Sequence, residues 1–200
     1  METTALIALL VFIVPMCFTP GPNNMLCAAH GAQHGFRSTV PLTLGMLTGW
    51  VVLGTIVGVA IVMIEANQFI FTGLTYIGAA YIAYLGISIA KTQPKPHGET
   101  DETERLGFQT GVLLQFVNGK AWIHFLAIMA TWGDLFGPGL LSKLALLAIN
   151  GFVGYPAVLV WAAFGVGLRK AFTSQENAKR LNVALGGSLV VLAVWILLPH

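Results

Sequence analysis

The sequence predicts an all-α membrane protein that crosses the bilayer six times. Of its 200 residues, 56% are apolar and only 9% are charged, whereas a soluble domain carries about 25% charged residues. The mean hydropathy is +0.79, and the apolar residues gather in long runs. These observations indicate a chain whose surroundings are lipid.

Six stretches reach the length that a spanning helix needs, roughly 20 predominantly apolar residues. The first of them has no Lys or Arg before it, so it lacks the basic start of a cleaved signal peptide and is interpreted as a retained span. Together they leave no room for a soluble catalytic domain, which argues against an enzyme. The stretches are 4–33, 40–64, 68–90, 108–132, 139–168 and 180–198.

The basic residues predict the orientation of the chain, because orientation follows Lys and Arg in short loops. Eight of the ten lie in the loops after the first, third and fifth stretches, whereas the opposite side holds only Lys143 and the tenth, Lys120, falls inside a stretch. We therefore expect both termini outside and three basic loops in the cytoplasm. The basic residues form no continuous stripe, which argues against a nucleic-acid partner.

A polar segment at 91–105, KTQPKPHGETDETER, divides the chain into two halves. The sequence thus predicts a first three-helix repeat at 1–90, a cytoplasmic linker at 91–107 and a second three-helix repeat at 108–200. Because three spans is an odd number, the second half enters the membrane in the opposite sense, as inverted-topology repeats of secondary transporters do. Each half also has an interrupted first helix, so we expect the first and fourth helices to be broken.

The first interruption is FTPGPNN, at Phe18 to Asn24. Proline removes a backbone donor and clashes with the preceding turn, so Pro20 and Pro22 around Gly21 should break the helix. Irregular backbone at this depth is tolerated only where protein or a polar cavity surrounds it. The freed carbonyls, the new half-helix N-terminus and the amides of Asn23 and Asn24 would then be ligand groups, and the positive helix end suits a carboxylate. The alternative is a packing kink that an Asn caps.

The second interruption, QFVNGK, places Lys120 inside the fourth span. Intramembrane charge is costly and usually marks function. All eight acidic residues map to loops or span ends, so a substrate carboxylate or backbone carbonyls would have to satisfy the ammonium. The alternative is that the side chain snorkels to the cytoplasmic surface. Gln115 and Asn118 could line the same cavity, and His124, one turn on, could relay protons or form an ordinary hydrogen bond.

The glycines and cysteines lead to two further expectations, one on helix packing and one on burial. In the second span, Gly45 and Gly49 share one face and Gly54 and Gly58 the opposite face, so this helix should pack closely on both sides. Whether one such face forms a homo-oligomer is left open. The two cysteines show no metal-binding or CxxC spacing and are expected to be buried apolar residues, and no cofactor is implied.

The interruptions carry motifs of a known family. TPGPNNML at Thr19–Leu26, followed by HGFR at His34–Arg37, and QFVNGKAW at Gln115–Trp122 resemble the LysE/RhtB family of amino-acid exporters. GAAYIAYLG at Gly78–Gly86 is similar to the third span of that family, and the resemblance covers the whole chain in length and order of spans. The family often has Asn-Pro-Lys where this chain has Asn118-Gly119-Lys120.

The resemblance implies a secondary active exporter, such as an antiporter, that moves small amino acids across a bacterial inner membrane on a proton or other ion gradient. Within the family the motifs are most similar to the cysteine/O-acetylserine exporter branch. The carboxylate of a bound amino acid would face Lys120 and a half-helix N-terminus, and its ammonium would face carbonyls freed by the first break. The residues that match the family signatures are Pro20, Gly21, Pro22 and Asn23, then Asn118 and Lys120.

Two alternatives from other classes remain open. Cys17 lies beside the proline-containing break, so a membrane thiol oxidoreductase that carries electrons is conceivable, although such chemistry needs two thiols that can meet. Cys27 is ten residues away, about 15 Å along an unbroken helix. The second alternative is a passive channel, which accumulation against a gradient would exclude.

Overall fold

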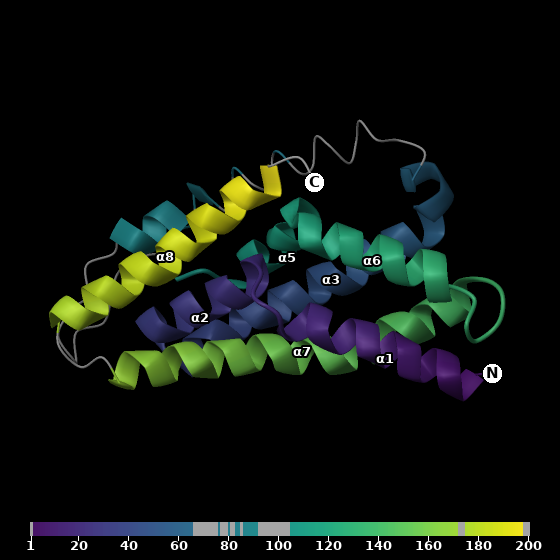
Figure 1. Cartoon of the computed structure of the whole chain (residues 1–200), viewed down its shortest axis with the longest axis horizontal. Helices are drawn as coiled ribbons and strands as arrows, with labels where there is room; N and C mark the ends of the chain where they lie inside the picture. The colour runs from purple at the N-terminus through teal and green to yellow at the C-terminus, as the bar shows by residue number, and fades with distance from the viewer. Residues whose placement is uncertain are drawn as a thin grey trace.

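The computed structural model describes residues 2–65, 76, 80, 83, 84, 86–91, 105–171 and 175–197. Within these residues every regular element is an α-helix, so the predicted all-α class is confirmed. The helices run side by side along the long axis of the molecule (Figure 1). They are α1 (Glu2–Phe18), α2 (Pro22–His34), α3 (Phe36–Glu65), α5 (Phe108–Val117), α6 (Gly119–Trp132), α7 (Leu140–Ala171) and α8 (Gln175–Leu197).

Both interrupted segments are broken helices, as predicted. A first break at residues 19–21 separates α1 from α2, which meet at a bend of 44°. A second break at Asn118 separates α5 from α6, with a bend of 65°. Pro22 is the first residue of α2, where its missing N–H has no intrahelical partner to lose. Asn118 caps α6, because its side chain accepts a hydrogen bond from the main-chain N–H of Lys120.

Among the described residues, two helices are long and apolar enough to cross a membrane, and the number rises to four if each bent helix pair counts as one span. The two are continuous stretches of α3 and α7, at Phe36–Ala60 and Leu140–Lys170. The sixth predicted stretch corresponds to α8, which is not among these segments. Most of the predicted third span and of the polar linker lies outside the described residues. The arrangement of six spans in two inverted repeats therefore stays a prediction.

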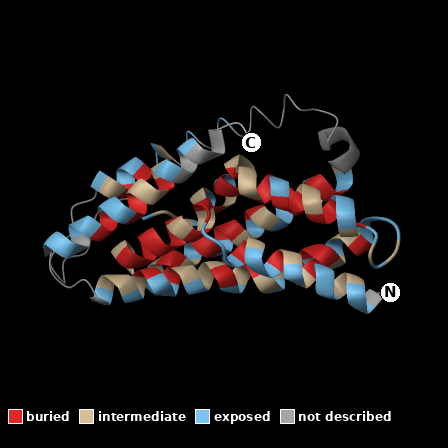
Figure 2. Cartoon of the chain, viewed as in Figure 1, coloured by how far each residue is buried: buried red, intermediate tan, exposed pale blue. Residues whose placement is uncertain are grey.

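The buried residues form two clusters, and the outward-facing parts of the helices are largely exposed (Figure 2). Phe152 and Leu141 are more than four-fifths exposed, at 84% and 81%. Apolar side chains this exposed suit a surface that faces lipid. The first cluster is rich in alanine and includes Ala28, Ala162 and Leu42; the second is built from bulkier side chains such as Phe125.

In the first cluster the helices approach until their main chains touch. A Cβ atom built on Gly31 of α2 would collide with the carbonyl oxygen of Ala162 in α7, and one on Gly111 of α5 would collide with that of Leu42 in α3. The glycines of α3 also behave as predicted. Gly45 and Gly49 face α5. Gly54 and Gly58, further along the same helix, face α6 and α7.

This packing predicts that Gly31→Leu destabilises the protein. The new side chain has to displace the α7 backbone, and overpacking of this kind costs about 1–3 kcal/mol. Thermal unfolding of the purified protein in detergent should show a lower Tm. Gly167→Leu in α7 is the matched control, because a Cβ at Gly167 meets no atom within 4 Å. Equal unfolding temperatures for the two variants would contradict the close approach of α2 and α7.

Candidate functional site

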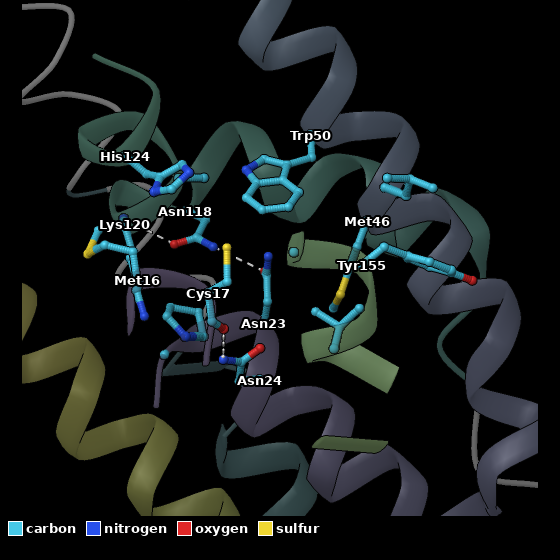
Figure 3. A pocket seen from close by; sticks show the side chains of 16 residues that line it. Met16, Cys17, Asn23, Asn24, Met46, Trp50, Asn118, Lys120, His124 and Tyr155 are labelled. Atoms are coloured by element: carbon cyan, nitrogen blue, oxygen red, sulfur yellow. Dashed lines mark hydrogen bonds between the residues drawn. The ribbon is translucent and has the colours of Figure 1, made fainter. Parts of the chain in front are cut away.

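The two breaks lie on either side of one cavity (Figure 3). The space between the side chains that line the cavity amounts to about 570 Å³, with the open solvent at its mouth included. Its walls come from α1, α2, α3, α6 and α7 and from both breaks. Seven of the nine predicted site residues line it: Gly21, Pro22, Asn23, Asn24, Asn118, Lys120 and His124.

The other two predicted residues lie directly behind the cavity wall. The carbonyl oxygen of Pro20 is 3.4 Å from the ammonium of Lys120. Gln115 is fully buried and forms hydrogen bonds with Asn23. The structure thus brings all nine residues to one cavity and its wall, and their role in binding a substrate stays a prediction.

Lys120 joins the two breaks. Its ammonium donates to the carbonyl oxygen of Thr19 at 3.1 Å, to the hydroxyl of the same residue at 3.0 Å and to the carbonyl oxygen of Pro20. The side chain fits because position 21 is glycine: a Cβ there would lie 2.9 Å from Cδ of Lys120. Its partners are neutral oxygens, so the positive charge is held but not neutralised.

The two neighbouring asparagines of α2 form hydrogen bonds with different breaks. Asn24 donates its amide to the carbonyl oxygens of Cys17 and Thr19, at 2.7 and 2.8 Å, and so satisfies carbonyls that the end of α1 leaves free. Asn23 instead reaches the second break. It exchanges hydrogen bonds with Gln115, at 2.9 and 3.3 Å, and accepts one from Asn118 at 3.1 Å. The amide of Asn23 is therefore the direct link between the broken helices.

Two half-helix N-termini point toward the cavity, and they differ in their caps. The N-terminus of α6 is capped by the side chain of Asn118. At the N-terminus of α2, Gly21 is in extended conformation and no side chain accepts from the first turn. The free N–H groups of a helix start carry a partial positive charge, which attracts anions. The start of α2 beside Lys120 is thus the most positive part of the cavity wall.

His124 lies on α6 one turn beyond Lys120, among aromatic rings. Its ring stacks on Phe12 with centroids 5.8 Å apart, and Trp50 lies at 5.6 Å. Its Nε2 atom is 3.0 Å from Oδ1 of Asn150 in α7. Asn150 was missed by the sequence analysis, although an amide in the middle of an apolar span is the same kind of signal as Lys120. Trp50 and Tyr155, which also line the cavity, are apolar or aromatic residues that no sequence pattern distinguishes from core.

Both cysteines lie in the described part of the chain, so the expectation that they are buried can be compared with the structure. Both thiols are free and buried, in agreement with their interpretation as packed apolar residues. Cys27 contacts Met46 with its sulfur 3.6 Å from the thioether, in the first cluster. Cys17 lines the cavity, and its sulfur is 3.9 Å from Oδ1 of Asn150.

The comparisons with known proteins agree with the motifs. The family model of the LysE type translocator matches residues 14–199. The chain belongs to this family. A translocator moves solutes across a membrane, so the protein is a membrane transport protein and not an enzyme. No solved structure matches the chain.

Several bacterial relatives cover almost the whole chain. A cysteine/O-acetylserine efflux protein of Klebsiella pneumoniae is 31% identical over 207 residues, with 98% of both chains covered. A protein of the same name from Salmonella typhi is 30% identical over 186 residues, covering 89% of this chain and 90% of its own. One from Escherichia coli O1:K1 is 27% identical over 197 residues, covering 98% and 99%.

The hydrogen bonds of Asn23 predict energetic coupling between the breaks. Asn23→Ala leaves the buried amide oxygen of Gln115 without its donor, whereas the amide nitrogen keeps its bond to the carbonyl of Gly111. An unsatisfied buried polar atom costs about 1–3 kcal/mol. Adding Gln115→Ala should then cost less than it does alone, because the partner is already lost. Thermal unfolding of the two single variants and the double variant measures this coupling. Strictly additive effects would show that the two side chains do not interact, and Thr48→Val, on an exposed face of α3, serves as the control.

Proposed function

We propose that this protein is a secondary active transporter that exports small amino acids through the cavity between the two breaks. It would act in the inner membrane of a bacterium with both termini outside, as two inverted three-helix repeats at 1–90 and 108–200 joined by a cytoplasmic linker at 91–107. Membership of the translocator family and the names of the efflux relatives support this proposal. Cysteine and O-acetylserine are the substrates that those names suggest for this chain.

The observation that supports this proposal most directly is the ammonium of Lys120. Among the described residues its hydrogen-bond partners are neutral oxygens, and it lies at the start of a helix that has no side-chain cap. Lys120 and the first turn of α2 together present a positive charge and free N–H donors to one cavity. An amino-acid carboxylate would supply the missing negative charge and accept from both. A cavity of this size with a few convergent polar groups suits a small zwitterion better than an electron-transfer role, because both described thiols are free.

The ammonium of the substrate is placed differently from the sequence-based expectation. The carbonyls freed by the first break are already bound, by Lys120 at Thr19 and Pro20 and by Asn24 at Cys17. A second ammonium at the same carbonyls would be repelled by that of Lys120. The carboxylate therefore docks at Lys120 and the ammonium points away from it, toward the opposite wall of the cavity.

Transport follows if the two repeats rock against each other around this site. The half-helices of each repeat end at the cavity, so a rigid movement of either repeat would change which end of the cavity is open. The coupling ion is a proton or another cation, and the cycle is an exchange of that ion for the amino acid. Oligomerisation is not needed for this cycle, since all groups of the site belong to one chain.

This function predicts that Lys120→Met strongly impairs efflux. A charge-assisted hydrogen bond contributes about 1.5–3 kcal/mol, so apparent affinity should fall about tenfold or more. The measurement is release of labelled cysteine and O-acetylserine from loaded cells and counterflow in proteoliposomes. Lys143→Met is the matched control, because Lys143 pairs with Asp134 at the surface, outside the cavity wall. Unchanged efflux by Lys120→Met would refute the site.

Two further experiments distinguish the transporter from a passive channel and from a thiol electron carrier. Accumulation of the amino acid against its gradient excludes a passive channel. Replacing both cysteines by serine should spare transport, whereas a thiol electron carrier would lose all activity.

A further inference from the structure

Asn150 is a buried amide that the proposed transport scheme does not yet use. It lies in α7 and is 1% exposed, between two side chains that line the cavity. Its Oδ1 atom is 3.0 Å from Nε2 of His124 and 3.9 Å from the sulfur of Cys17. Its Nδ2 atom is buried and has no hydrogen-bond partner.

The amide oxygen of Asn150 faces both the imidazole of His124 and the thiol of Cys17. An amide oxygen can only accept, so Nε2 of His124 must carry the hydrogen. In the neutral ring the other nitrogen, Nδ1, then has a free lone pair and can only accept.

The unpartnered Nδ2 indicates that Asn150 is not present to stabilise the fold. A buried donor without a partner is a cost, and an apolar side chain of similar size would avoid it. The surroundings are apolar, since Leu146, Leu147 and Ala157 of the same helix belong to the second cluster. The hydrogen bond between the amide oxygen of Asn150 and Nε2 of His124 explains why an amide stands in such a place.

The substrate ammonium needs an acceptor other than the carbonyls of the first break, which are occupied. His124 lines the same cavity one turn beyond Lys120 on α6 and, among the hydrogen bonds of the described residues, uses only Nε2. Trp50 lies beside it at 5.6 Å and also lines the cavity. A nitrogen lone pair next to an indole face is a favourable environment for a small cation.

We propose that Asn150 is a positioning residue that holds His124 with Nε2–H toward α7, so that Nδ1 accepts a hydrogen bond from the ammonium of the transported amino acid. This inference rests on the proposed function and adds how the amino group of the substrate is recognised. Lys120 and the start of α2 bind the carboxylate, and the pair of His124 and Asn150 selects for an amine. The site would therefore discriminate an amino acid from the same molecule without its amino group.

The test compares L-cysteine with 3-mercaptopropionate, which keeps the carboxylate and the thiol but lacks the amine. Purified protein in proteoliposomes is assayed by counterflow, and the ratio of the two apparent affinities is the readout. The wild-type protein should favour cysteine. Asn150→Leu and His124→Gln should each reduce that preference about tenfold, since one frees the ring and the other removes Nδ1 while keeping a donor for Asn150.

Matched variants separate positioning from mere structure. Asn150→Gln keeps an amide oxygen for His124 and should retain more of the preference than Asn150→Leu. Thr43→Val removes a buried hydroxyl that, among the described residues, bonds only within α3, and it should change nothing. Asn150→Leu removes one unsatisfied buried donor but leaves Nε2–H of His124 without its acceptor, so its unfolding temperature should stay close to that of the wild type. A merely structural Asn150 would instead lower the Tm and weaken both substrates equally.

Three results would overturn the inference. It is wrong if Asn150→Leu and His124→Gln keep the wild-type preference for cysteine while transport continues. It is also wrong if Asn150→Leu lowers the Tm and leaves the ratio unchanged. A wild-type protein that transports 3-mercaptopropionate as well as cysteine would overturn it without touching the export function, whereas a protein that transports neither would overturn both.

Discussion

The main-chain groups at the two breaks impose the constraint on which the rest of the site depends. Inside a membrane each unpaired N–H or C=O costs several kcal/mol, so a broken helix persists only if side chains replace its lost partners. Here the replacements come from the other break or from the next turn: Lys120 and Asn24 bind carbonyls at the end of α1, and Asn118 caps α6. The polar network exists because the helices are broken, and the cavity exists because the network keeps the two breaks apart.

Satisfying those groups leaves the cavity with an uneven distribution of charge. The carbonyls are covered by donors, whereas the first turn of α2 has no capping side chain and Lys120 has no negative partner among its hydrogen bonds. The wall near the first break is therefore positive, and the wall around His124 is aromatic and offers an acceptor. A zwitterion has the complementary arrangement, with one end of each sign a few bonds apart, which a simple anion or cation lacks.

The breaks and most of the site could be predicted from the sequence because their signals are local. Two prolines around a glycine and a lysine in an apolar span each violate a rule of helix or membrane chemistry, so their positions stand out. The partners of these groups could not be predicted, because the contact between Lys120 and Thr19 joins residues a hundred positions apart. His30 shows the same limit: it is 2% exposed and pairs at 2.9 Å with Thr39, which belongs to the next helix.

The two clusters that border the cavity differ in how they can move. On the side where α2 packs on α7, the contacts are main chain against main chain at Gly31 and Gly165, so separation there requires a whole helix to shift. On the other side, Gly54 faces only side chains, of Phe125 and Leu147, which can change rotamer. Small rotamer changes can thus admit a ligand at one end, while the other end opens only by rigid movement of α2 with its amides. Because Asn23 and Asn24 belong to α2, any such movement must also rearrange the bonds that hold both breaks.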